Sequence, residues 1–134
     1  MKKIKNIEKV TSIYRTWMPS DIAFLKSLQW SNQNLKIVFY CQLRNQVNGW
    51  PDLFKEFFEI SFTFENACDI MLKFNSRGLQ QLSGFDIANI SDRGLEKVNF
   101  QIEDYENGII SFNCESIVIN EVGNVSRNLS DLLI

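Results

Sequence analysis

Three cysteines and a group of carboxylates are the side chains in this chain that could carry out chemistry. Cys41, Cys68 and Cys114 could act as nucleophiles or metal ligands, but the sequence contains no histidine. The usual base at neutral pH is therefore missing, and histidine-dependent catalytic triads and metal sites are excluded. The cysteines also lack the Cys-x-x-Cys spacing of a zinc site. We interpret them as reduced thiols on apolar faces, where a free cysteine packs like a small hydrophobic residue.

The acidic side chains gather beside one expected hairpin turn. Glu103, Asp104 and Glu106 are close together, and Asp86 and Asp92 lie in or just after the preceding strand. Such carboxylates could form a glycosidase pair or a calcium site, but their spacing is diagnostic of neither. The alternative is that they shape and solubilise the turns. We therefore predict no catalytic residue, no metal and no cofactor, and a carboxylate-based hydrolase is the least favoured function.

Trp50 is the side chain that the sequence singles out for binding a partner. It follows Asn48-Gly49 and precedes Pro51 in a polar segment that is expected to form a loop. Tryptophan is enriched at the hot spots of protein interfaces, so Trp50 is a candidate partner-binding residue. Trp17, by contrast, lies on an apolar helical stripe and is expected in the core.

Length and charge set the class of protein. The chain has 134 residues and a formal net charge of -2. That charge does not fit the strongly basic surface of a nucleic-acid-binding protein. No apolar run is long enough for a secretory signal or a membrane span. We expect a single cytoplasmic domain, residues 1–134, that binds neither nucleic acid nor membrane; its oligomeric state is not indicated.

The N-terminal residues 1–18 are expected to form an amphipathic helix that packs on a sheet. Apolar residues recur there at steps of three and four, and Pro19 ends the pattern. The stripe consists of Ile4, Ile7, Val10, Tyr14 and Trp17.

The region 21–122 is expected to be antiparallel β-structure. Residues 21–30 fit either a capped helix or a strand, and the strand is favoured. Residues 58–65 alternate strictly, with Phe58, Ile60, Phe62 and Phe64 on one side. Residues 68–74 follow so closely that the two segments should form a hairpin, with Cys68, Ile70, Leu72 and Phe74 on one face.

The last strands show a change of pattern. After Glu115 the apolar positions move from even to odd numbers, so this strand must twist, bulge or pass from one packing layer to another. Residues 123–134 form a tail that could be a short helix or a docked segment. The resulting fold is mainly β (α+β): an antiparallel sheet or two-layer β-sandwich of about six to eight strands with one N-terminal α-helix.

The segments around residues 83–92 and 106–119 resemble small bacterial immunity proteins of polymorphic toxin systems, and in particular the immunity protein 50-like group. In that resemblance a Phe-x-Ile-x-x-Ile strand is followed by a hairpin and a Phe-x-Cys-x-x-Ile strand. The matching positions here are Phe85, Ile87, Ile90, Phe112, Cys114 and Ile117. Residues 58–72 are similar to the preceding strand pair.

The resemblance implies a non-enzymatic cytoplasmic protein that binds and neutralises a cognate toxin, which is then its protein partner. It carries over no functional residue. A ligand-binding or structural β-sandwich module is the alternative, with a pocket between the sheet layers in place of a protein interface.

Overall fold

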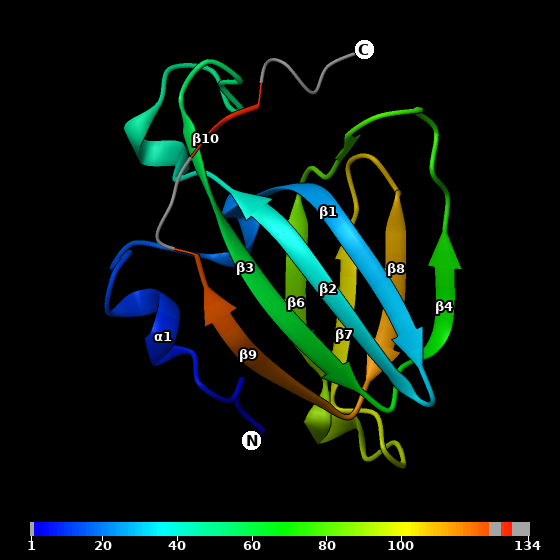
Figure 1. The fold of residues 1–134 in the computed structure, drawn as a ribbon. Helices are drawn as coiled ribbons and strands as arrows, with labels where there is room; N and C mark the ends of the chain where they lie inside the picture. The colour runs from blue at the N-terminus through cyan, green and yellow to red at the C-terminus, as the bar shows by residue number, and fades with distance from the viewer. Residues whose placement is uncertain (1, 124–126, 130–134) are drawn as a thin grey trace.

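The computed structural model describes residues 2–123 and 127–129, which form two antiparallel β-sheets stacked face to face (Figure 1). The first sheet has the strand order β10-β3-β2-β1-β5, with β9 also paired to β3, and the second has the order β4-β8-β7-β6. The strands are β1 (Ile22–Ser31), β2 (Asn34–Cys41), β3 (Glu56–Glu65), β4 (Cys68–Leu72), β5 (Gln80–Gln81), β6 (Phe85–Asn89), β7 (Phe100–Asp104), β8 (Ile110–Cys114), β9 (Ser116–Val122) and β10 (Arg127–Asn128).

The predicted fold class, a mainly β two-layer structure, is confirmed. The structure contains more strands than the six to eight expected from the sequence. The additional strands β5 and β10 are only two residues long, too short to produce an alternating pattern. The helical turns are short: α1 (Glu8–Thr11), η1 (Pro19–Asp21), η2 (Arg44–Gln46) and η3 (Ser91–Arg93). Within residues 2–123 and 127–129, no helix has the length and apolar character needed to cross a bilayer.

The core lies between the two sheets and is built on one face of β3. Phe58, Ile60, Phe62 and Phe64 are each no more than 4% exposed, which confirms the predicted apolar face. β3 pairs with β2 along one edge and with β9 and β10 along the other, so it is central to its sheet. Phe64 meets Phe112 of the second sheet edge to face, with ring centroids 4.8 Å apart. Aromatic rings therefore fill the space between the layers.

The chain changes layer after Glu65, where the sequence predicts a hairpin. That prediction is wrong, because β4 pairs with β8 in the second sheet. Both edges of β3 are already occupied, and Asn66, with φ of 52°, turns the chain toward the other layer. The reverse crossing occurs at Glu115, between β8 and β9. Of the three alternatives for the change in the apolar pattern, the structure therefore shows the passage between layers.

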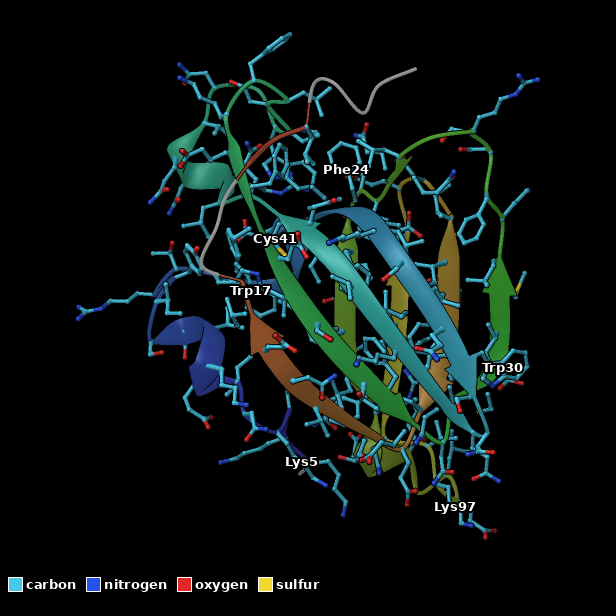
Figure 2. All side chains as sticks on the ribbon, viewed as in Figure 1. Lys5, Trp17, Phe24, Trp30, Cys41 and Lys97 are labelled. Atoms are coloured by element: carbon cyan, nitrogen blue, oxygen red, sulfur yellow. The ribbon has the colours of Figure 1, made fainter. Side chains whose placement is uncertain are left out.

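The N-terminal helix is shorter than predicted. Among residues 2–18, α-helix is confined to Glu8–Thr11. It starts late because Lys5 lies extended beside β9: its N–H donates to Ile117 O at 2.9 Å and its carbonyl accepts from Ile119 N at 3.0 Å. Asn6, with φ of 65°, then turns the chain into α1. The apolar stripe still faces the core, and Trp17 is buried between the N-terminal segment and the first sheet (Figure 2).

Two further expectations are decided along the chain. Of residues 21–30, all but Asp21, which ends η1, belong to strand β1, as favoured. The apolar face expected on residues 68–74 is only partly buried: Ile70 packs against the core, whereas Leu72 and Phe74 are 40% and 49% exposed on an edge strand and its continuation. Of the expected C-terminal tail, residues 127–128 pair with β3 and Leu129 is buried, while residues 124–126 and 130–134 lie outside the described residues.

Candidate functional site

The cysteines are placed as packing residues. Cys41 and Cys114 are buried, Cys68 is half-buried, and all three are free thiols. Burial raises the pKa of Cys114 to about 12 and raises the pKa of Cys41 further above its usual value. A nucleophilic cysteine needs a lowered pKa, so neither buried thiol is activated.

The structure divides the acidic cluster between two faces. Asp104 points inward and is fully buried, whereas its neighbour Glu103 faces outward, directly across the strand pair from Asp86. Glu106 lies in the turn after β7 and accepts a hydrogen bond from Ser83 Oγ, while Asp92 is in η3. In the described part of the chain, histidine, cysteine and carboxylate side chains form no group of three or more that could hold a metal ion.

Trp50 lies in the loop between η2 and β3 and is half-buried. Its indole Nε1–H donates to Gln42 O at 2.9 Å. The Gln42 side chain in turn holds Asp52: its Nε2 donates to Asp52 O at 2.9 Å, and its Oε1 accepts from Asp52 N at 2.7 Å. The Trp50 ring packs on a second apolar cluster, on the outer face of the first sheet, that includes Phe24 and Phe57. Trp50 thus anchors the loop to the sheet.

Arg44 is the residue that sequence reasoning missed. Its guanidinium carbon lies 3.8 Å from the centroid of the Trp50 ring, a cation–π contact, and its Nε donates to Ser20 O at 2.9 Å. The Arg44 backbone N–H donates to Asp21 Oδ1 at 3.1 Å. The side chain is nevertheless solvent-exposed. These contacts hold a charged, planar group in one orientation at the surface, where it can pair with a carboxylate.

Two clefts carry exposed aromatic side chains, one lined by Gln42 and Leu43, chain neighbours of Arg44, and the other by Arg44. One, of about 360 Å³, is lined by residues that include Leu43, Val47 and Phe54, and Phe54 is 75% exposed. The other, of about 290 Å³, is lined by Arg44 itself and by Tyr105, which is 68% exposed. The name Arg44 surface is used below for Arg44, Trp50, Phe54, Tyr105 and these two clefts.

The composition of the Arg44 surface is that of an interface hot spot. Tryptophan, tyrosine and arginine dominate the binding energy of protein interfaces. Arg44 and Trp50 are held by their mutual contact and by hydrogen bonds to Ser20 O and Gln42 O, and Asp52 Oδ1 accepts from Phe54 N at 3.1 Å at the start of the Phe54 turn. Groups ordered before binding lose less entropy when a partner docks.

Comparison with known proteins supplies the remaining observation. The family model described as Immunity protein PIM8 matches residues 5–120, a range that contains both Arg44 and Trp50. No curated protein and no solved structure matches the chain.

Proposed function

The chain belongs to the immunity protein PIM8 family, and on that premise we propose that it neutralises one cognate toxin by binding it through the Arg44 surface. The match confirms the class to which the sequence resemblance pointed, through PIM8 and not through the immunity protein 50-like group. The general role of the chain is that of the family, which is to bind a toxin protein and neutralise it. The toxin, the contact surface and the mode of action are the proposal.

The stack of Arg44 on Trp50 carries this proposal. An arginine on a surface usually loses side-chain entropy when it forms an ion pair, which leaves little net stabilisation. The Arg44 guanidinium already has a fixed plane, set by the Trp50 ring and Ser20 O. A toxin carboxylate that approaches in that plane can accept two parallel N–H donors at a reduced entropic cost.

The exposed aromatic residues supply the apolar part of the same interface. Tyr105 lines the same cleft as Arg44, and Phe54 lines a second cleft with Leu43, the chain neighbour of Arg44. Burying such rings around a charge pair excludes water and strengthens the electrostatic interaction. The toxin surface that fits has an acidic side chain between apolar contacts.

Neutralisation then occurs by occupation of the toxin and not by catalysis. The chain lacks histidine, and burial raises the pKa of both buried thiols. The three free cysteines favour action in the cytoplasm, where thiols stay reduced.

Co-expression with the toxin encoded by a neighbouring gene tests this proposal. Wild-type protein should protect cells and co-purify with the toxin. Arg44→Ala should weaken binding by more than about 2 kcal/mol, roughly 30-fold in Kd. Arg44→Lys keeps the charge but loses the planar fork, and should restore only part of the affinity.

Arg93→Ala is the matched control, because Arg93 is an exposed arginine in η3. It should bind as the wild type does. Equal affinity of Arg44→Ala and Arg93→Ala would place the toxin on another surface, and failure of the wild type to bind or protect would refute the toxin assignment itself.

A further inference from the structure

β4 is an uncovered edge of the second sheet. β8 lies along one side of it, and no strand lies along the other within the described residues (Figure 1). The opposite edge strand, β6, is protected, since it packs against η1 and since Asn89 Nδ2 donates to Lys2 O. An exposed edge presents unpaired backbone groups to which another strand can bind.

The hydrogen-bond pattern shows which backbone groups of β4 face outward. Lys73, just after the strand, donates its N–H to Ile109 O at 2.8 Å, so its amide points toward β8. Amide directions alternate along an extended strand, so the N–H and C=O of Leu72 point away from β8. The register of β4 against β8 shifts between Cys68 and Met71, and Asp69 has φ of 53°, so the regular alternation covers Met71 to Lys73 and does not extend to Ile70.

The exposed side chains along β4 are more apolar than those of edge strands that are protected against pairing. Met71 is 70% exposed and Leu72 is 40% exposed. Trp30, 63% exposed at the end of β1, adds a ring close to the start of β4 (Figure 2). The two ends are tied together, because Ala67 N donates to Gln33 O at 2.8 Å.

We propose that β4 pairs antiparallel with β4 of a second copy of this chain, about a two-fold axis at Met71. In this register Asp69 of each copy faces Lys73 of the other, Ile70 faces Leu72, and Met71 faces itself. The two charge pairs are complementary, and the apolar residues meet in the middle. The outward backbone groups of Leu72 then bond to Ile70 of the other copy, so the pairing requires the backbone groups of Ile70, in the irregular part of β4, to face the partner.

The symmetry of the charges is the reason to choose a second copy as the partner. A self-complementary patch is what a two-fold interface needs, because each contact occurs twice. Asp69 is held on the outer face by Asn113 Nδ2, 3.2 Å from its Oδ2, on the same side as Met71. Figure 1 shows β4 and the loop that carries Trp50 on opposite sides of the molecule, so both copies keep the Arg44 surface open to a toxin.

A cysteine at the axis reports the register directly. Met71 and its copy form a non-hydrogen-bonded pair with Cα atoms about 4.5 Å apart, within reach of a disulfide. In a Cys68→Ser background, Met71→Cys should form an intermolecular disulfide under mild oxidation. Lys73→Cys is the matched control: it lies on the same strand but faces residue 69, so it should remain unlinked.

Charge variants test the pairing without a covalent bond. Sedimentation velocity of the full chain should show a dimer that Lys73→Glu and Asp69→Lys each abolish, since each places like charges opposite one another. An equimolar mixture of the two variants should recover the dimer, because it restores both opposite-charge pairs. Thermal unfolding of each variant alone checks that the fold persists, in particular at Asp69, whose φ is 53°.

The inference is overturned if the wild type stays monomeric up to on the order of 1 mM. It is also overturned if both charge variants remain dimeric, if their mixture stays monomeric, or if Lys73→Cys crosslinks as readily as Met71→Cys. None of these outcomes depends on a toxin, so dimerisation and toxin binding can fail independently.

Discussion

Asp104 and Ile110 are joined inside the sandwich by a hydrogen bond from the Ile110 backbone N–H to Asp104 Oδ1, 2.8 Å long. The other oxygen, Oδ2, is buried without a partner among the described residues. Burial raises the pKa of the Asp104 carboxyl, and the backbone hydrogen bonds, that of Ile110 foremost, offset this only in part. The folded state therefore favours the protonated form of Asp104.

This predicts a pH-dependent cost in stability. Because the folded-state pKa lies above 3.8, the value for an ordinary aspartate, the contribution of Asp104 is fully present below pH 3.8 and is lost as pH rises through the raised pKa. Asp104→Asn keeps an acceptor for Ile110 but cannot ionise. The melting temperature of the variant minus that of the wild type should increase between about pH 3 and pH 7. A difference that stays constant over this range would show that Asp104 does not titrate as inferred.

Phe62 is expected to be among the most costly core positions. Its ring stacks on Phe64 with centroids 5.4 Å apart and meets Phe39 edge to face at 5.5 Å. Phe62→Ala should lower the free energy of unfolding by about 3–5 kcal/mol in urea titrations, and Phe62→Asp should prevent folding. Lys36→Ala, on the exposed face of β2, should change stability by less than about 0.5 kcal/mol. A stable, folded Phe62→Asp variant would refute the placement of this face.

Gly84 is required where the chain enters β6. Its φ is +67°, and an added Cβ would lie 2.8 Å from Tyr105 Cε1. Gly94, with φ of +69° and no atom within 4 Å of an added Cβ, is the control for backbone strain alone. Gly94→Ala should cost about 1 kcal/mol, and Gly84→Ala should cost more. An added Cβ would also lie 2.9 Å from Glu106 Cγ, so the excess should shrink but not vanish when Tyr105→Ala is combined with Gly84→Ala. An unchanged excess would mean that the ring contact is not part of its cause.

Thiol reactivity should follow burial. A thiol reagent should modify only Cys68 in the native protein, and slowly, because burial and the neighbouring Asp69 raise its pKa. Cys41 and Cys114 should react only after denaturation, since both are buried. Mass spectrometry of the modified protein gives the count and the positions. Rapid native modification of Cys114 would contradict its place in the core.

Gln42 should affect the Arg44 surface only by ordering the loop of residues 50–54. Its buried amide forms both hydrogen bonds to the Asp52 backbone. Gln42→Ala leaves the Asp52 N–H and C=O without these partners and should cost about 1–3 kcal/mol of stability. Hydrogen exchange should quicken in residues 50–54 more than in β2. Unchanged exchange there would show that other contacts suffice to order the loop.

Much of the architecture could be predicted from local patterns. The alternation in β3 reports its buried face because successive side chains of a strand point to opposite sides. The change of apolar parity after Glu115 likewise predicted a twist, a bulge or a crossing between layers, and the structure shows the crossing. The hairpin after Glu65 was predicted wrongly, because short connections favour hairpins only where the first strand has a free edge, and both edges of β3 are occupied.

The sequence by itself determined the fold class, the core face of β3 and the lack of histidine chemistry. These properties depend on residue type and on spacing within one segment. Only the tertiary structure decided that Arg44 lies on Trp50, next to Ser20, and that β4 is left as an open edge among residues 2–123 and 127–129. Such features depend on which distant segments meet when the layers close, and a long-range pairing leaves no periodic pattern in the chain.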